Sequence, residues 1–283
     1  MKRSLSRTDV PPPPPRSLFF VPGSRSDMIA KLPRWPADLA VVDLEDAVAA
    51  ADKDSARSAA VHAIAELGTS ADVVLLRINP SGSRWFADDL DAAAQSQARG
   101  VVLPKFESAD EVAELRARLP AGAVIVVGLE TARGVADCRV LLEADVDAAY
   151  FGAEDYIADT GGYRTDAGTE VLYARSHVLL GARLAGVAAI DQAVLAIRDD
   201  DRFVADAEAG KAIGYTGKIC VHPRQVELAH QVFTPSAAEI DHARAVLQMA
   251  ESGGVGTVDE QMVDDVHIRM AQQTLARVRD EPE

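Results

Sequence analysis

Two apolar stretches of this sequence end on acidic residues, although each reads as a buried strand. VIVVGLE, residues 124–130, stops on Glu130, and YFGAED, residues 150–155, stops on Glu154 and Asp155. Carboxylates that gather in one place and are partly removed from water repel one another unless a cation compensates their charge. This pattern indicates the binding of a divalent metal ion, with helix capping or a surface ion pair as the alternative for each single acid.

Glu130 and Asp155 are the best pair of ligands, because they follow neighbouring strands. Oxygen ligands without cysteine favour Mg²⁺, or Mn²⁺ in its place, held by one or two carboxylates together with waters and substrate oxygens. In a continuing strand the side chains of Glu154 and Asp155 would point to opposite sides, so we expect Asp155 to be the ligand and Glu154 to contact the substrate or the backbone. Three acids of another apolar stretch are expected to lie next to the residues of the site without binding the metal themselves: Asp43, Glu45 and Asp46.

Arg77 stands at the end of the apolar stretch VVLLRIN, residues 73–79. Its guanidinium could grip a substrate carboxylate through two parallel hydrogen bonds. The alternative is a buried ion pair with Asp43 or Glu45. His222 in CVHPRQ could act as an acid, a base, a ligand or a hydrogen-bonded residue of the rim, and composition favours the last of these.

A basic loop follows the first apolar stretch. PGSRSDMIAK, residues 22–31, places Gly23 and Ser24 before a helix and makes Arg25 and Lys31 available to bind phosphate. Helix N-termini also attract anions. The alternative is that both basic residues lie on a solvated helix face.

Eight short apolar stretches alternate with longer, alanine-rich amphipathic segments, which is the pattern of βα units around a parallel sheet. The stretches span residues 17–23, 39–46, 73–79, 100–105, 123–130, 148–155, 187–194 and 217–223. Eight such units predict a TIM (β/α)8 barrel, in which catalytic groups gather at the carboxyl ends of the strands. A doubly wound open sheet shares this rhythm, but no glycine-rich phosphate loop follows the first stretch.

The pattern divides the chain into three parts. Residues 1–15, which end in PPPPP, predict an extended N-terminal arm, and residues 16–233 contain the barrel. Residues 234–283 read as two helices around the glycine-rich GGVGT, residues 253–257, and cannot form a ninth barrel unit. We expect them to be a helical extension that packs on the barrel or on a neighbouring subunit.

Charge and cysteine content argue against several classes of function. Lys and Arg total 29 against 44 Asp and Glu, and the resulting net charge of −15 argues against non-specific binding to nucleic acid or anionic membranes. No apolar run reaches the roughly 18 residues that span a bilayer. The two cysteines, Cys138 and Cys220, are too few for a disulfide framework. We therefore expect a cytoplasmic protein.

Seven segments of the sequence, in order, resemble the HpcH/HpaI aldolase and citrate lyase β-subunit superfamily, and within it the CitE-like and malyl-CoA or citramalyl-CoA lyase proteins. The segments are RSLFFVPGSR, VVDLEDAVAAADKDSAR, LLRIN, LPKFES, GLETARG, FGAEDY and GKICVHPRQV. The resemblance implies a TIM barrel and a Mg²⁺-dependent carbon–carbon lyase. Such an enzyme cleaves a 3-hydroxyacyl-CoA thioester into acetyl-CoA and a 2-oxo acid by retro-Claisen chemistry.

Matched position by position, the resemblance assigns roles to individual residues. It makes Glu130 and Asp155 the metal ligands and Arg77 the residue that binds the substrate carboxylate. The contacts to the CoA thioester that it implies are Phe20, Arg25, Lys31, Val221 and His222. It also implies a homo-oligomer, a trimer or a hexamer, in which Asp264 from the C-terminal extension of a neighbouring subunit completes the site. Glu260 stands where the family often has glycine, which leaves the geometry of this extension open.

Three other functions stay open on these residues. A thioesterase acting on malyl-CoA would use the same machinery and then capture water, and a citrate lyase β subunit would act on a carrier-bound acyl group within a complex. A barrel that binds without catalysis is disfavoured because Arg77, Glu130 and Asp155 are all present. The sequence also leaves the acyl-CoA substrate open, because the one methyl group that separates glyoxylate from pyruvate is worth only about 1–3 kcal/mol in a pocket.

Overall fold

The computed structural model describes three ranges of the chain, residues 13–251, 256–258 and 261–279. Contacts between residues divide the chain into two compact units. One unit is Pro15–Phe233, and the other consists of the residues from Thr234 onward together with those before Pro15. Most of the predicted N-terminal arm lies outside the described residues, as does Glu260. The two units are described separately below.

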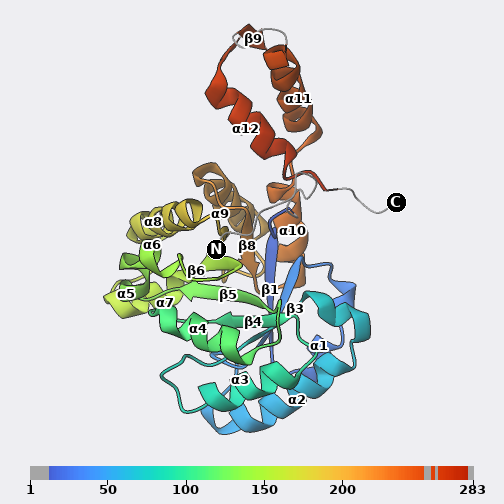
Figure 1. Cartoon of the computed structure of the whole chain (residues 1–283), viewed down its shortest axis with the longest axis vertical. Coiled ribbons are helices and arrows are strands. Elements are labelled where there is room, and N and C mark those ends of the chain that lie inside the picture. The colour runs from blue at the N-terminus through green and yellow to red at the C-terminus, as the bar shows by residue number, and fades with distance from the viewer. Residues whose placement is uncertain (1–12, 252–255, 259–260, 280–283) are drawn as a thin grey trace. The chain divides into compact units, whose positions relative to one another are not determined.

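The first unit is a closed barrel of eight parallel strands surrounded by helices (Figure 1). Its strands are β1 Ser17–Pro22, β2 Leu39–Asp43, β3 Val74–Arg77, β4 Gly100–Leu103, β5 Val124–Leu129, β6 Ala148–Phe151, β7 Ala188–Asp191 and β8 Gly217–Cys220. They are hydrogen-bonded in chain order, and β8 closes the barrel on β1, where Lys218 is in register with Ser17. The predicted TIM barrel is confirmed, and the open sheet is excluded.

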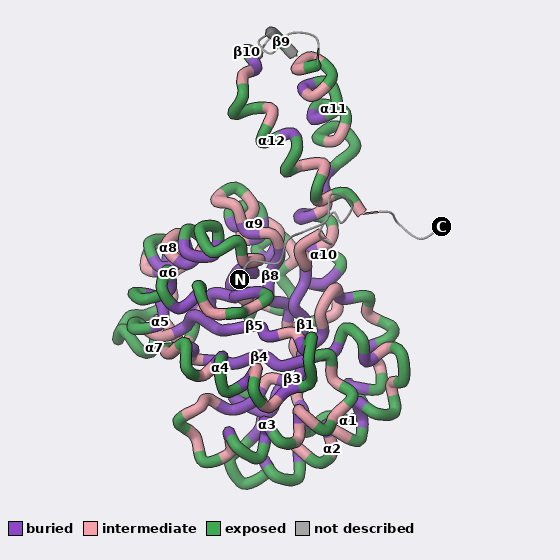
Figure 2. Tube along the Cα trace, in the orientation of Figure 1, coloured by how far each residue is buried: buried purple, intermediate pink, exposed green. Residues whose placement is uncertain are grey.

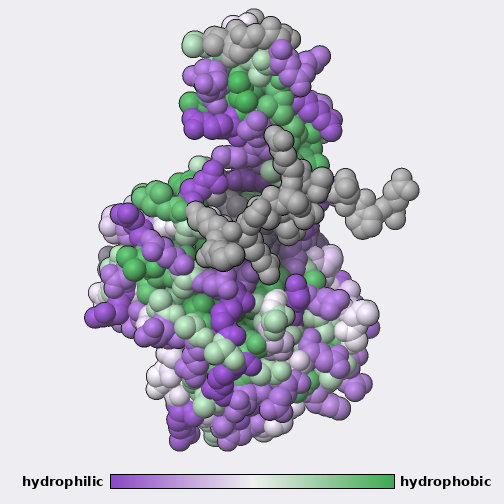
Figure 3. All heavy atoms as spheres, viewed as in Figure 1, coloured by the Kyte–Doolittle hydropathy of each residue, from purple (hydrophilic) through white to green (hydrophobic). Residues whose placement is uncertain are grey.

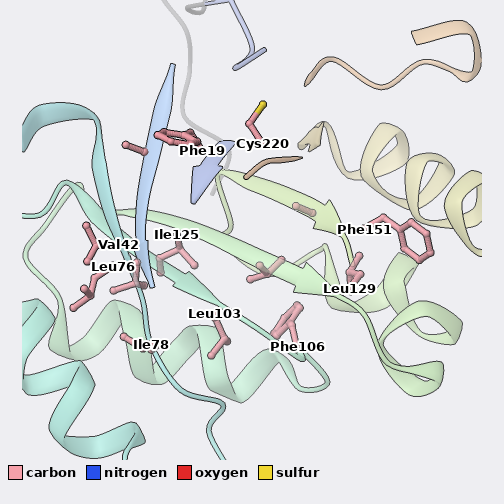
Figure 4. Packing of buried hydrophobic residues seen from close by; sticks show 14 of the residues in the cluster. Phe19, Val42, Leu76, Ile78, Leu103, Phe106, Ile125, Leu129, Phe151 and Cys220 are labelled. Carbon is pink, nitrogen blue, oxygen red and sulfur yellow. The ribbon is translucent and has the colours of Figure 1, made fainter. Parts of the chain in front are cut away.

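Side chains of the strands alternate between two apolar layers, one inside the barrel and one beneath the helices. The inner layer consists of Leu18, Val41, Leu75, Val102, Val126, Ala148, Tyr150, Ile190 and Ile219. Figure 4 shows part of the outer layer, in which Phe19, Val42 and Leu76 are members of one large buried cluster. Because both faces of each strand are buried, the strands read in the sequence as continuous apolar runs.

At least one helix follows each strand, and the outward sides of these helices are exposed while the strands are buried (Figure 2). They are α1 Ser26–Ile29, α2 Lys53–Ala65, α3 Phe86–Gln95, α4 Ala109–Arg118, α5 Ala132–Ala136, α6 Cys138–Leu141, α7 Ala153–Thr160, α8 Thr169–Ala185, α9 Asp200–Ile213 and α10 Pro223–Phe233. The helix α2 buries Ala56, Ala60 and Ile64 on one face. The helix α4 begins at a capping box, in which the Glu111 carboxylate accepts from the backbone N–H of Ser108 at 3.0 Å.

The strand predicted over residues 39–46 ends early, at Asp43. The Asp43 carboxylate accepts hydrogen bonds from the backbone N–H groups of Glu45, at 2.8 Å, and Ala47, at 3.2 Å. An aspartate that binds the backbone just after itself turns the chain out of a strand. Glu45 and Asp46 therefore belong to the loop that follows β2 and not, as predicted, to the strand.

The acids of YFGAED lie on a helix and not, as predicted, at the end of a strand. β6 ends at Phe151 and α7 begins at Ala153, so Glu154 and Asp155 occupy the first turn of α7. Acidic residues are favourable there because the N-terminal end of a helix carries a partial positive charge. The expectation that these two side chains alternate across a strand is wrong, because successive helical residues are instead about 100° apart around the axis.

The second unit consists of two helices and a short hairpin. Its elements are α11 Ala237–Glu251, β9 Gly256–Val258, β10 Gln261–Val263 and α12 Asp265–Leu275. The two strands pair antiparallel, and the buried apolar residues are Ala243, Val246, Val263 and Ala271. Asp264 caps α12, because its Oδ1 accepts from the backbone N–H of Val266 at 2.9 Å and lies 2.8 Å from His267 Nδ1. Both predicted helices are present, whereas the hairpin was not predicted.

Hydrophilic residues cover most of the barrel face seen in Figure 3, with hydrophobic residues in small groups between them. This agrees with the 44 acidic residues of the chain. In the described part of the chain, no helix combines the length and the apolar character that a membrane span requires.

Candidate active site

A cavity of about 340 Å³ lies among the carboxyl ends of the barrel strands. Its lining includes Phe20, Asp43, Arg77, Glu130, Tyr150, Asp155 and Val221. In a TIM barrel this end of the strands carries the catalytic groups. The structure thus brings Arg77 at the end of β3, Glu130 just after β5 and Asp155 in the first turn of α7 into one cavity.

Arg77, the last residue of β3, is held by two buried acids. Its Nε and Nη2 donate to the two carboxylate oxygens of Asp43, its neighbour in register on β2, at 2.7 and 2.6 Å. Its Nη1 lies 2.9 Å from Oε2 of Glu45, so the alternative of a buried ion pair is present with both acids. Burial opposes the charge of the guanidinium, but the Asp43 carboxylate outweighs it and raises the pKa of Arg77. Because Arg77 also lines the cavity, the pair fixes the guanidinium at the edge of the site.

Glu130, which follows β5, is buried, with 2% of its surface exposed. Its Oε1 accepts hydrogen bonds from the backbone N–H of Lys105 at 2.8 Å and from the Tyr150 hydroxyl at 3.0 Å. Its Oε2 lies against Gly152, where any larger side chain would collide with it, and it receives no hydrogen bond from a described residue. One oxygen fixes the carboxylate, and the other is available to a ligand.

Asp155 pairs with Lys105, which follows β4. Lys105 Nζ lies 3.3 Å from Asp155 Oδ1 and 3.6 Å from Asp46 Oδ2, and it also makes a short hydrogen bond to Glu45. Burial opposes the charge of the ammonium, but the three carboxylates outweigh this and raise the pKa of Lys105 above its ordinary value. The charged ammonium therefore compensates three acids, one of which is a candidate metal ligand.

Glu154 lines the same cavity but has a different partner from its neighbour on α7. Its carboxylate lies 3.4 Å from Nε of Arg164. Of the two adjacent acids, Asp155 alone joins the carboxylates around Lys105. The structure thus separates the two acids by their partners and not by alternation along a strand.

The residues expected to contact coenzyme A lie at different depths. Phe20 and Val221 line the cavity, and the ring of Phe20 lies 5.0 Å from the guanidinium carbon of Arg77. His222 is exposed before α10, where its Nδ1 accepts from the backbone N–H of Arg224 at 3.2 Å. The structure does not place His222 in the lining of the cavity.

Arg25 and Lys31 lie on the surface near the end of β1. They share the carboxylate of Asp27, with Arg25 Nε at 2.7 Å from Oδ1 and Lys31 Nζ at 3.5 Å from Oδ2. About half of each basic side chain is exposed, at 55% and 45%. Exposed ion pairs of this kind exchange partners readily, so both cations can bind an anionic group from solution.

The oxygen donors of this site suit Mg²⁺, an ion that does not need all of its ligands from the protein. Five acids lie close to two cations here: Asp43, Glu45, Asp46, Glu130 and Asp155, with Arg77 and Lys105. Among the described residues, no group of three or more His, Cys, Asp or Glu is arranged to hold a metal ion alone. Mg²⁺ needs no such group, because it keeps waters and substrate oxygens in its shell. Glu130 and Asp155 would hold it.

Without metal, the protein should lose stability between pH 5.5 and pH 8, and Glu130 should cause a measurable part of the loss. Burial raises the pKa of this carboxyl from 4.5 to about 7. The folded protein therefore binds the proton more tightly than the unfolded chain does, and the resulting stability is full below pH 4.5 and is lost as the pH rises through about 7. Over this interval the loss should be roughly 2 kcal/mol.

Urea unfolding in EDTA at both pH values, for the wild type and for Glu130→Gln, measures this effect. The free energy of unfolding of the variant, relative to the wild type, should increase by roughly 2 kcal/mol from pH 5.5 to pH 8, because glutamine does not titrate. The lower pH stays above the sequence pI of about 4.8. If the difference in the free energy of unfolding between the variant and the wild type does not change with pH, Glu130 is already ionised at pH 5.5.

Two residues of this site, Tyr150 and Lys105, are not among the residues predicted from the sequence. Tyr150 could have been found by alternation, because Ala148 lies inside the barrel and the residue two positions later must lie there too. In the sequence, Lys105 is only the last residue of the apolar stretch 100–105. Its contacts depend on a left-handed backbone, with φ of 51°, that nothing in the sequence around it predicts.

A closed eight-stranded barrel, with a largely buried arginine and carboxylates at the carboxyl ends of its strands, defines this chain as a TIM-barrel enzyme. Residues 16–223 match the model of the HpcH/HpaI aldolase/citrate lyase family, and the chain belongs to that family. The expectation that it is a lyase is thereby confirmed.

Similar proteins cover almost the whole chain. The citrate lyase subunit beta-like protein of Deinococcus radiodurans is 45% identical in an alignment 281 residues long, which covers 95% of this chain and 99% of that protein. A (3S)-malyl-CoA thioesterase of Cereibacter sphaeroides is 32% identical over 281 residues, 93% of this chain and 94% of that protein. A solved structure of the protein CitE from Mycobacterium tuberculosis, in complex with magnesium, acetoacetate and coenzyme A, matches with a TM-score of 0.82 and 33% identity, covering 94% of this chain and 98% of that one.

Proposed function

We propose that this enzyme is a Mg²⁺-dependent carbon–carbon lyase that cleaves a 3-hydroxyacyl-CoA, of the malyl-CoA or citramalyl-CoA type, into acetyl-CoA and a 2-oxo acid. The observation that carries the proposal is one cavity in which a fixed guanidinium, Arg77, lies with two candidate ligands, Glu130 and Asp155. The CitE complex with magnesium, acetoacetate and coenzyme A supports it, because its ligands are of the same chemical classes.

In this proposal the two ends of the substrate bind at different depths. The carboxylate binds Arg77, whose guanidinium is already oriented by Asp43. The thioester passes the wall formed by Phe20 and Val221. The phosphates of coenzyme A then reach the surface, where Arg25, Lys31 and His222 are exposed. Together, the contacts to the carboxylate, the thioester and the phosphates place the reacting carbons next to Glu130 and Asp155.

The proposed cleavage is a retro-Claisen reaction. The hydroxyl loses its proton, the bond between the hydroxyl-bearing carbon and the α-carbon of the thioester breaks, and the bonding electrons form a thioester enolate that takes up a proton to give acetyl-CoA. The chemistry that Mg²⁺ supplies when bound is stabilisation of the negative charge on the oxygen. Asp264 of a neighbouring subunit, or an ordered water, takes up the hydroxyl proton and gives a proton to the enolate.

This use of Asp264 requires a homo-oligomer, which the family resemblance implies to be a trimer or a hexamer, and mixing inactive subunits tests it. Arg77→Lys lacks the carboxylate fork, and Asp264→Asn lacks the proton carrier, so each variant alone should have little activity. Co-expressed in equal amounts, they should recover about one quarter of the wild-type activity, because one site in four combines an intact barrel with an intact Asp264 from its neighbour. A mixture as inactive as its components would show that Asp264 does not act across subunits.

A thioesterase is the second candidate function, and the similarity to a (3S)-malyl-CoA thioesterase favours it. The same cavity could hold the same thioester, with water attacking the thioester carbonyl. The bond that breaks would then be carbon–sulfur, and the products would be the free hydroxy acid and free CoA. The residues that bind the substrate would be unchanged, so only the products separate the two functions.

A third candidate is the β subunit of a citrate lyase complex, which would act on a carrier-bound citryl thioester. The similarity to a citrate lyase subunit beta-like protein favours it. The purified chain alone distinguishes this candidate, because such a subunit would be inactive on free CoA thioesters and would acquire activity only with its carrier protein.

A screen of 3-hydroxyacyl-CoA thioesters tests the proposal and identifies the substrate. The purified enzyme is incubated with each thioester in Mg²⁺ or in EDTA, and the 2-oxo acid released is measured. We expect release from a malyl-CoA or citramalyl-CoA thioester in Mg²⁺ and none in EDTA. Turnover that survives EDTA would contradict the role of the metal.

A further inference from the structure

Lys105 contacts both candidate metal ligands, one through its backbone and the other through its side chain. Its N–H donates to Glu130 Oε1 at 2.8 Å, and its Nζ lies 3.3 Å from Asp155 Oδ1. The same ammonium bonds Glu45 and lies 3.6 Å from Asp46. The position of both ligands therefore depends on one residue that the proposed reaction does not use.

The backbone of Lys105 is unusual. Among the described residues it is the only one other than glycine with a positive φ, 51°. This left-handed conformation is unfavourable for L-residues, and such strain persists where the surrounding structure holds it, often at functional sites. At Lys105 the Glu130 and Asp155 contacts hold it.

The ammonium of Lys105 and a bound divalent ion would compete for the carboxylate of Asp155. A divalent ion that binds Asp155 approaches the carboxylate that the ammonium already compensates, and two cations near one carboxylate repel each other. Glu45 offers the ammonium another place, because it is almost fully buried and its Oε1 already bonds Nζ. The ammonium can thus give up Asp155 and keep Glu45.

We propose that Lys105 is a positioning residue whose ammonium is the counter-ion of Asp155 in the metal-free enzyme and yields this carboxylate to Mg²⁺ while it stays bound to Glu45. The proposal rests on the proposed function, since it takes Asp155 as a metal ligand. Lys105 then lowers the intrinsic affinity of the site for metal and keeps the loop after β2 and the start of α7 in place while the metal is absent.

Two variants separate the charge of Lys105 from its backbone. Lys105→Met removes the ammonium and keeps a side chain in the left-handed conformation, whereas Lys105→Gly removes the ammonium and suits that conformation. In a titration with Mn²⁺ followed by electron paramagnetic resonance, both should bind Mn²⁺ about tenfold more tightly than the wild type, since one opposing charge is gone. In EDTA, Lys105→Met should unfold at a lower urea concentration, because Asp46 and Asp155 lose their counter-ion and Glu45 keeps only Arg77.

Lys211→Met on α9 is the matched control, because Lys211 does not line the cavity, and its Mn²⁺ affinity should equal that of the wild type. Tighter binding by both Lys105 variants supports the proposal. Unchanged or weaker binding by Lys105→Gly, with normal binding by the wild type, would overturn it and leave the proposed function intact. If the wild type itself binds no Mn²⁺, the metal-dependent function fails, and the proposal fails with it.

Discussion

Replacing Arg77 with lysine should lower kcat/KM by about 10²- to 10³-fold while the protein stays folded. Lysine keeps the positive charge that Asp43 and Glu45 need, but it loses the planar fork that grips the Asp43 carboxylate with two parallel bonds and so orients the remaining N–H groups for the substrate. Arg77→Ala would be a poorer test, because unpaired buried carboxylates cost about 3–5 kcal/mol of stability and could unfold the barrel. Steady-state kinetics with the substrate found in the screen measures the effect.

A second arginine whose side chain is largely buried, at 11% exposure against 13% for Arg77, provides the control for this substitution. Arg57 on α2 pairs with Asp89 on α3, with Nε 2.6 Å from Oδ1, and neither residue lines the cavity. Arg57→Lys should change the urea midpoint about as much as Arg77→Lys does and leave kcat/KM at the wild-type value. If Arg77→Lys also retains the wild-type kcat/KM, the guanidinium does not bind the reacting end of the substrate.

Replacing Glu130 with glutamine should lower kcat/KM by about 10³-fold, because the loss of metal-derived charge stabilisation is worth about 4 kcal/mol in the transition state. Glutamine has nearly the shape of glutamate, so the hydrogen bonds from Lys105 and Tyr150 to Oε1 can largely be kept. A neutral amide oxygen is a poorer ligand for a hard cation than a carboxylate. The Mg²⁺ concentration that gives half-maximal activity should therefore rise.

Glu114→Gln is the matched control for this prediction. Glu114 is on α4 and pairs with Arg118 at the surface, so its replacement should leave both kcat/KM and the Mg²⁺ midpoint unchanged. An unchanged Mg²⁺ midpoint in Glu130→Gln, combined with normal activity, would remove Glu130 from the metal site.

The fold could be predicted from the sequence because each strand is buried on both faces. Eight apolar runs with helical segments between them leave few architectures, and the absence of a glycine-rich phosphate loop favoured the closed one. The boundaries of the strands could be predicted less well than the fold. The chain leaves β2 at Asp43 because that carboxylate binds the backbone beyond it, a local contact that a hydrophobic pattern does not register.

The position of the site could be predicted in part, because strand ends in a barrel meet at one rim. This places Arg77, Glu130 and Asp155 near one another without any knowledge of the helices. The partners of these residues could not be predicted. Backbone angles at two turns decide these contacts. The turn before α7 places Asp155 on a helix and not on a strand, and the turn at Lys105 decides whether its side chain reaches Asp155.

The measurement that tests the central claim most directly is a product balance in a single reaction. The enzyme is incubated with Mg²⁺ and the thioester found in the screen, and acetyl-CoA, 2-oxo acid and free CoA are measured in the same samples over time. A carbon–carbon lyase should release acetyl-CoA and 2-oxo acid in equal amounts, without free CoA. Free CoA together with the intact hydroxy acid, and no 2-oxo acid, would show that the carbon–sulfur bond breaks instead and would contradict the proposed lyase.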